Sequence, residues 1–238
     1  MTAAAKQADG ESGRIGGAIP WGAYVWYPVL RFLQIITMGF LYHVRWRGAH
    51  RIPREGAFVL APNHQSWLDP PLLGVPVRQR MFRYMANAKY FPVPVVGSIL
   101  RGSGVIPIDL KARLDRRAYA ACLQTLRAGE GLVVFPEGTR SHDGRLGKLN
   151  TGPARMALQT GAALVPVAIT GAYDVWPRSR KAPRLRGNIM LKFYPPIPVA
   201  LCESPQEISP RAEQLTQQIE NVLRTRINAY YRWLKRHG

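Results

Sequence analysis

A histidine and an aspartate stand five positions apart, His64 and Asp69, just after a short apolar run at 57–61. That run predicts a buried strand, which Pro62 ends. A loop at the end of a strand is where a rigid sheet can position reactive groups. A neutral imidazole can take a proton from a hydroxyl near neutral pH, and a nearby carboxylate can fix its tautomer and stabilise the imidazolium. The pair could therefore act as a general base with its orienting carboxylate.

The spacing of the two residues sets a condition on this interpretation. On an ideal helix, five positions place two side chains about 140° apart. His64 and Asp69 can therefore meet if a helix begins between them or if a turn folds Asp69 back. The alternative is structural: the carboxylate caps a helix and the imidazole belongs to a satisfied polar turn.

A second group of polar residues follows another apolar run, in the sequence Phe-Pro-Glu-Gly-Thr-Arg-Ser at 135–141. The guanidinium of Arg140 offers a planar fork suited to phosphate. Glu137 would repel a phosphate, so we expect it to accept from a substrate hydroxyl or to position Arg140. The backbone amide of Gly138 is a candidate donor to an oxyanion. The structural alternative is that Glu137 pairs locally with Arg140 and that Thr139 caps a helix.

Together these stretches resemble the glycerolphosphate acyltransferase superfamily, in particular the bacterial 1-acyl-sn-glycerol-3-phosphate acyltransferases. The first block of that family, Asn-His-x-x-x-x-Asp, is matched at 63–69, and its third block, Phe-Pro-Glu-Gly-Thr-Arg-Ser, at 135–141. A further block, an apolar strand with a central proline, is matched at 165–169. Lys148 also stands where such proteins carry a lysine before the next helix. The resemblance covers roughly residues 43–200.

The resemblance implies an O-acyltransferase. A fatty acyl group would pass from acyl-CoA or an acyl carrier protein to the free hydroxyl of 1-acyl-sn-glycerol 3-phosphate, giving phosphatidic acid. His64 would be the base and Asp69 its orienter. No covalent acyl-enzyme is expected, because a thioester is already activated and the sequence has no Gly-x-Ser-x-Gly elbow. We expect no metal and no cofactor beyond the thioester. The expected substrate-binding residues are Glu137, Gly138, Thr139, Arg140, Lys111 and Lys148.

One position departs from the family pattern. The second block of the family usually ends with an arginine that helps to hold the acceptor phosphate, and Leu110 stands there instead. Lys111 or Arg113 could take its place. Alternatively, the acceptor differs: glycerol 3-phosphate, a lyso-ornithine lipid or a glycolipid would undergo the same acyl transfer.

The formal net charge of +19 indicates an anionic partner. Nucleic acid is one alternative, but no recognised binding motif accompanies the arginine clusters, so we expect no nucleic acid. We favour the anionic headgroups of a phospholipid membrane. Coenzyme A phosphates or an acidic acyl carrier protein are further candidates. The two isolated cysteines, Cys122 and Cys202, indicate buried thiols in a reducing compartment.

The elements that would position these residues divide the chain into three parts. Residues 1–18 are small and polar, which predicts a disordered tail. Residues 19–42 combine helical apolar spacing with interfacial aromatics, which favours a membrane-associating helix lying in the interface over a span or a core helix. We therefore expect a peripheral or monotopic protein on the cytoplasmic face of the cell membrane. The acyltransferase domain is expected at 43–238.

Within that domain, short apolar runs alternate with helical patterns, which predicts an α/β fold with a mostly parallel central sheet flanked by helices. The clearest helix is expected at 113–128, with Gly129 after its end. Its expected inward residues are Leu114, Ala118, Ala121, Cys122, Thr125 and Leu126. A long helix is expected at 209–235, and a broken, proline-interrupted helix at 90–100. Strands are expected at 43–48, 57–61, 81–86, 104–108, 131–135, 163–169 and 188–193.

Overall fold

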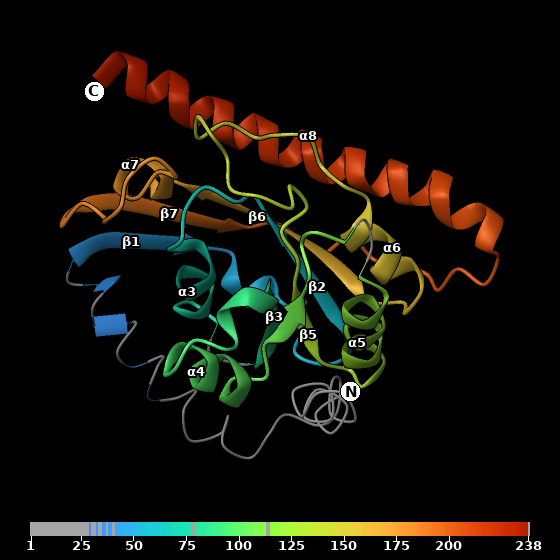
Figure 1. Ribbon diagram of the computed structural model, residues 1–238. Coiled ribbons are helices and arrows are strands. Elements are labelled where there is room, and N and C mark those ends of the chain that lie inside the picture. The colour runs from blue at the N-terminus through green and yellow to red at the C-terminus, as the bar shows by residue number, and fades with distance from the viewer. Residues whose placement is uncertain are drawn as a thin grey trace.

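The computed structural model describes residues 29, 32, 35, 36, 38, 39, 41–77, 80–112 and 115–237. Its centre is a seven-stranded sheet of order β1-β7-β6-β2-β5-β3-β4, with helices on both faces (Figure 1). Of the six strand pairs in the described residues, five are parallel, which confirms the predicted α/β class. The strands are β1 (Tyr42–Arg47), β2 (Phe58–Pro62), β3 (Phe82–Asn87), β4 (Ile106–Ile108), β5 (Gly131–Val133), β6 (Ala163–Thr170) and β7 (Gly187–Phe193).

Strand β2 lies in the middle of the sheet, and all five of its residues are buried. It pairs in parallel with β5 on one side and with β6 on the other. Phe58 and Leu60 face one half of the core, while Val59 and Ala61 face the other half. A strand buried on both faces must be apolar throughout, which explains the continuous apolar run. Its carboxyl end delivers the chain to His64.

The helices form two layers over the sheet. On one face α5 (Arg116–Arg127), α6 (Gly152–Leu158) and the long α8 (Pro205–His237) share one core cluster with β2 and β6. On the other face α3 (Asp69–Gly74) and α7 (Ala172–Val175) pack into a second cluster. In Figure 1, α8 runs along the whole molecule. The remaining helices are α4 (Val96–Gly102) and the 3₁₀ turns η2 (Ala49–Arg51) and η3 (Ala88–Tyr90).

Helix α5 shows why the sequence folds as it does here. Its five buried residues are among the six that the helical spacing predicted, and the sixth, Leu114, lies outside the described residues. The helix begins at Arg116 because the side chain of Asp115 accepts from the Ala118 amide at 3.0 Å. Gly129, with a φ of 78°, follows its last turn as expected.

The structure departs from the sequence-based expectations in several elements. Strand β7 runs antiparallel to β6, so β7 and its parallel neighbour β1 point opposite to the rest of the sheet. The helix expected at 90–100 begins at Val96, after η3 and a proline-containing turn. Helix α8 begins at Pro205, one turn earlier than expected.

The expectations for residues 1–18 fall outside the described residues, as do most positions of the segment 19–42. No helix among the described residues is long and apolar enough to cross a bilayer. Arg113, one candidate substitute for the missing block-two arginine, also lies outside them.

Candidate active site

His64 and Asp69 are in contact: the Nδ1 atom of the imidazole lies 2.8 Å from Oδ2 of the carboxylate. Helix α3 begins at Asp69 itself, so the turn 63–68 folds its carboxylate back toward the histidine. The backbone amides of Gln65 and Ser66 donate to the same oxygen, at 2.5 and 2.7 Å. Because Asp69 is fully buried and accepts at Oδ2, the proton of a neutral His64 stays on Nδ1. Its Nε2 atom then offers a lone pair to an incoming hydroxyl.

One ring contact and two anchors on the residues flanking His64 restrict the imidazole further. Its ring stacks on Phe135, with centroids 4.1 Å apart and planes at 25°. The preceding residue, Asn63, bonds twice to the backbone of Ile169 in β6. Its Nδ2 donates to the Ile169 carbonyl at 2.9 Å, and its Oδ1 accepts the Ile169 amide at 2.7 Å. Gln65 donates to the Gly144 carbonyl at 2.6 Å. These contacts leave the ring little freedom to move.

Glu137 joins the two predicted motifs. Its Oε1 accepts the backbone amide of His64 at 2.7 Å, and its Oε2 accepts the amide of Gly147 at 2.9 Å. The Ser141 amide in turn donates to the His64 carbonyl at 2.8 Å. Burial raises the pKa of Glu137, while the hydrogen bonds from the His64 and Gly147 amides act in the opposite direction. In the described residues, the carboxylate bonds to these amides and not to Arg140, so the structural alternative of a local Glu137–Arg140 pair is not formed.

Gly138 and Thr139 shape the turn between Glu137 and Arg140. Gly138 has a φ of 68°, which favours glycine. Its amide donates to the Phe135 carbonyl at 3.0 Å, so it is already engaged and we do not retain it as an oxyanion donor. Thr139 does not cap a helix, because the next helix begins at Gly152.

Arg140 lies over the ring of Trp67, with its guanidinium carbon 4.0 Å from the ring centroid. Its Nη1 atom is buried and has no hydrogen-bond partner among the described residues. Burial, and then the positive charge of Arg178, lower the pKa of Arg140. Arg178 itself donates to Thr139 Oγ1 and lies beside Nε2 of His142, both at 3.2 Å. Two guanidiniums thus share one region, and no described carboxylate forms an ion pair with either. Such an arrangement favours an anion.

The two predicted lysines are placed differently. Lys148 follows Gly147, whose amide binds Glu137, so it lies beside the motif turn. Lys111 is exposed, and its amide closes a local turn on Asp109 at 2.8 Å. No hydrogen bond or ion pair in the described part of the chain connects the Lys111 ammonium to the His64 cluster. Leu110, at the position of the expected arginine, is 56% exposed.

Sequence reasoning missed Arg178 and Trp67 as members of this site. Arg178 belongs to a basic loop whose sequence is typical of a solvated surface. Thr139 lies 39 positions earlier in the chain, and only the tertiary fold brings the two together. Trp67 stands inside the first motif, but its ring is identified as a partner of Arg140 by the structure alone. Among the described residues, no group of three or more His, Cys, Asp or Glu side chains could hold a metal ion.

Comparison with known proteins gives a consistent result. A model of the family described as "Acyltransferase" matches residues 43–170. A chloroplastic 1-acyl-sn-glycerol-3-phosphate acyltransferase of Arabidopsis thaliana is 32% identical over 162 residues, which are 66% of this chain and 44% of that protein. The chain thus spans less than half the length of the chloroplastic relatives that it matches. A protein of the same name from Bacillus subtilis is 28% identical over 174 residues, 72% of this chain and 83% of its own.

One solved structure extends the likeness to the fold. The crystal structure of the 1-acyl-sn-glycerophosphate acyltransferase of Thermotoga maritima superimposes with a TM-score of 0.72 at 26% identity. The match covers 85% of this chain and 78% of the other.

Proposed function

This chain belongs to the acyltransferase family, and from that premise we propose that it transfers a fatty acyl group from a thioester to the free hydroxyl of 1-acyl-sn-glycerol 3-phosphate. The product is phosphatidic acid, a phospholipid precursor. The observation that carries the proposal is the contact of His64 with the buried Asp69, next to a pair of arginines that have no carboxylate partner in the described residues. The base suits the hydroxyl of a phosphorylated alcohol, and the arginine pair suits its phosphate.

In the proposed reaction, Nε2 of His64 takes the proton of the acceptor hydroxyl as its oxygen attacks the thioester carbon. Asp69 stabilises the imidazolium that forms. The tetrahedral intermediate collapses, the new ester bond stays with the acceptor, and the thiolate leaves and recovers the proton from His64. General base catalysis of this kind contributes about 10² to 10⁴ in rate. No acyl group is attached to the protein at any step.

The phosphate of the acceptor is assigned to Arg140 and Arg178. The buried Nη1 of Arg140 lacks a partner among the described residues, and the neighbouring Arg178 adds a second positive charge. A phosphate would satisfy that nitrogen and relieve the repulsion between the two guanidiniums. Arg178 thereby supplies the cation that Leu110 cannot, while Lys111 and Lys148 remain outer candidates. Glu137 acts as a positioning residue, because its oxygens hold the His64 and Gly147 amides.

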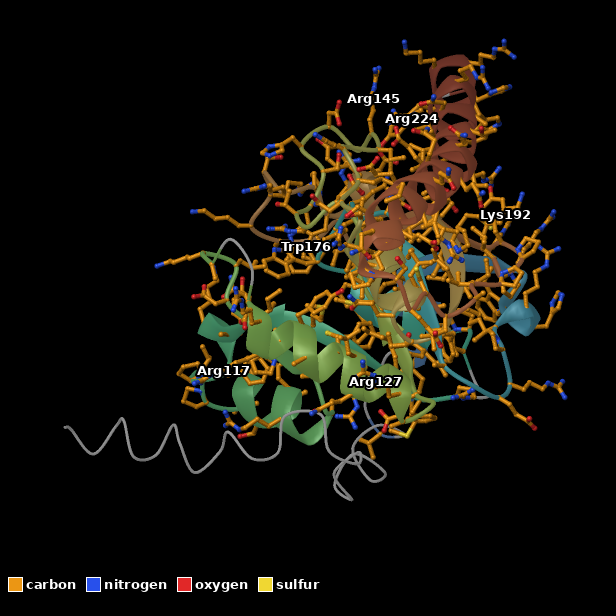
Figure 2. All side chains as sticks on the ribbon, turned by 90° about the vertical axis from the view of Figure 1, so that its right-hand side faces the viewer. Arg117, Arg127, Arg145, Trp176, Lys192 and Arg224 are labelled. Atoms are coloured by element: carbon orange, nitrogen blue, oxygen red, sulfur yellow. The ribbon has the colours of Figure 1, made fainter. Side chains whose placement is uncertain are left out.

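The acyl donor is acyl-CoA or an acyl carrier protein, and we propose no cofactor besides this co-substrate. The proposed location is the cytoplasmic face of the cell membrane, bound through anionic phospholipids. A nucleic-acid partner is not favoured, because the positive charge is not gathered in one stripe. Figure 2 shows the basic residues Arg117, Lys192 and Arg224 on three different elements, α5, β7 and α8, and on different sides of the molecule.

A second acceptor keeps the same chemistry. Leu110 removes the arginine expected at that place and thereby favours an acceptor such as glycerol 3-phosphate, a lyso-ornithine lipid or a glycolipid. The two possibilities differ in the acceptor alone, since His64 and Asp69 serve both.

One experiment separates these acceptors and tests the function as a whole. The purified protein is incubated with mixed acyl-CoAs, or with acyl carrier protein thioesters, and with each acceptor separately. Mass spectrometry then identifies the products. We expect phosphatidic acid from 1-acyl-sn-glycerol 3-phosphate. Turnover of another acceptor alone would favour the second possibility, and no acylated product from any acceptor would overturn the proposal.

A further inference from the structure

The turn that leads into α4 exposes an unusual run of apolar side chains. Val93, Val95, Val96 and Ile99 are 41–70% exposed, with Val95 the most exposed of the four. Two neighbouring prolines, Pro92 before Val93 and Pro94 after it, are also exposed. A protein that met only water at this surface would gain by burying these side chains, and such contiguous patches mark interaction sites. We call residues 91–99 the α4 loop.

The α4 loop is held in this outward conformation at a local cost. Val95 has a φ of 64° and is, among the described residues, the one non-glycine with a positive φ. For a β-branched residue this is a strained backbone, which persists where the surroundings impose it. The Gly97 amide donates to Val93 at 2.7 Å, and a side chain at Gly97 would collide with the Phe91 carbonyl. The exposed valines are therefore presented by a fixed turn.

Two cations flank this apolar tip. The ammonium of Lys89 lies 5.0 Å from the centre of the Tyr90 ring. Arg101 donates to the Phe91 carbonyl at 2.7 Å, and both cationic side chains are exposed. An apolar tip with lysine and arginine beside it matches a lipid boundary, where the apolar groups enter the acyl region and the cations meet headgroup phosphates. The same charges would add nothing at an interface with an apolar protein segment.

The α4 loop is also connected to the candidate active site. The ring of Tyr90, the residue just before the loop, meets the Trp67 ring edge to face, with centroids 5.8 Å apart. Trp67 is the ring under Arg140, and it is itself 43% exposed. Amphipathic aromatics of this kind favour the boundary between lipid and water. A loop that rests on a membrane would therefore hold Arg140 close to the headgroup level.

We infer that the α4 loop inserts into the boundary between headgroups and acyl chains of an anionic bilayer, with Lys89 and Arg101 at the phosphates. This contact is separate from the segment 19–42. We assign the contact the role of letting Arg140 bind the headgroup of a lipid that is still in the bilayer. That role rests on the proposed function, whereas the insertion itself does not.

A label on Val95 tests the insertion directly. Cys122 and Cys202 are the two cysteines of the chain and both are buried, so Val95→Cys creates a single exposed thiol for an environment-sensitive fluorophore. Vesicles of phosphatidylcholine and phosphatidylglycerol are then added to the full chain. We expect a blue shift, and quenching by lipids that carry a quencher in the acyl region. The same label at Leu201→Cys, an exposed leucine between β7 and α8, should keep its emission in water. A Val95 label that stays in water while the protein binds vesicles would overturn the inference.

Vesicle affinity gives a second measurement. We expect Val95→Asp and Ile99→Asp each to weaken binding on the order of tenfold, because each removes a buried branched side chain from the lipid. Leu201→Asp, at a leucine that is 56% exposed between β7 and α8, should bind as the wild type does. Circular dichroism checks that each variant is folded. Affinities of Val95→Asp and Ile99→Asp equal to that of Leu201→Asp would contradict the inference.

The two proposals fail in different ways. If the wild type acylates no acceptor but the Val95 label enters the bilayer, the proposed function falls and the membrane contact stands. If the wild type makes phosphatidic acid while the label remains in water and the aspartate variants bind normally, the reverse holds.

Discussion

Glu137 reaches across 73 positions of sequence to accept the backbone amide of His64 at 2.7 Å. Its other oxygen accepts the Gly147 amide, so one carboxylate fixes the histidine turn and the backbone at Gly147 relative to each other. Sequence reasoning assigned this glutamate to the substrate or to Arg140. Its geometry instead gives it a positioning role. Its loss is therefore predicted to change the stability of the fold, and not to remove a group that touches substrate.

We predict a change in the pH dependence of stability for Glu137→Gln. Burial raises the pKa of Glu137, so the folded protein binds this proton more tightly than the unfolded chain, where a glutamate has a pKa of about 4.3. Unfolding then releases a proton, and the wild-type free energy of unfolding falls as pH rises from about 4.3 through the higher folded pKa. Glutamine cannot titrate and should lack this fall. It also leaves one amide without an acceptor, which costs about 1–3 kcal/mol.

Chemical denaturation at several pH values measures this. Glu55→Gln, on an exposed loop, is the matched control and should keep the wild-type slope. If Glu137→Gln has the same slope as both, the buried carboxylate does not titrate as described.

For His64→Ala we expect kcat to fall about 10²- to 10⁴-fold with the acceptor KM little changed, because the base acts on the reacting proton and not on the phosphate. His43→Ala, on the exposed side of β1, should retain wild-type turnover. Steady-state acylation assays measure both. Undiminished kcat in a folded His64→Ala protein would refute the mechanism.

Asp69→Asn tests the tautomer argument. An asparagine can turn its NH₂ toward Nδ1 and so favour the wrong tautomer, and we expect kcat to fall by two to four orders of magnitude. The Gln65 and Ser66 amides also lose a charged acceptor, so the free energy of unfolding should fall by about 1–3 kcal/mol. Kinetics and denaturation are compared with Asp109→Asn, a carboxylate of an exposed turn. A variant that unfolds more easily yet turns over normally would show that Asp69 is structural.

Arg178→Gln should raise the KM for 1-acyl-sn-glycerol 3-phosphate about tenfold, since one charge-assisted hydrogen bond to phosphate is lost. Arg180→Gln, two positions along the same loop, is the matched control and should leave KM unchanged. The effect should vanish with a monoacylglycerol, which has no phosphate. An equal loss with both acceptors would mean that Arg178 supports the loop and does not read the phosphate.

Val95→Gly should stabilise the protein while it weakens the membrane contact. Glycine relieves the strain at a φ of 64°, worth about 1–3 kcal/mol, and loses about 0.5–1 kcal/mol through its freedom in the unfolded chain. We therefore expect a net gain on the order of 1 kcal/mol. Val96→Gly, without a positive φ, should lower stability instead. Thermal and chemical unfolding of the two variants should thus change in opposite directions.

The sequence predicted best the elements whose contacts join residues that are close together in the chain. The described inward residues of α5 were predicted correctly, because 3.6-residue periodicity is a local property. Its start was not, because the cap at Asp115 makes the helix begin at Arg116 and not at 113. The His64–Asp69 contact was predicted with a condition, and the structure meets it by starting α3 at Asp69 with prolines in the first turn, where proline is tolerated.

What the sequence could not show depends on partners far along the chain. The antiparallel direction of β7 is set by its pairing with β6 and leaves no mark in its own apolar alternation. The Gly138 amide seemed available as a donor until the fold turned it onto the Phe135 carbonyl. Arg178 looked like any other cation of a basic loop, because nothing near it in sequence reveals Arg140 as its neighbour.

Asn63 presents both hydrogen-bonding groups of its side-chain amide to Ile169, much as a neighbouring peptide unit would, so β6 gains one more rung beyond the end of β2. His64, the next residue, is therefore attached directly to the rigid centre of the sheet. The turn that carries Arg140 shares this anchor, because Glu137 and Ser141 bond to the His64 backbone. Arg178 reaches that turn from another loop, through its side chain to Thr139. Exchanging the Arg178 loop alone for one that fits a different headgroup would redirect the enzyme to another lipid while the His64 ring kept its position.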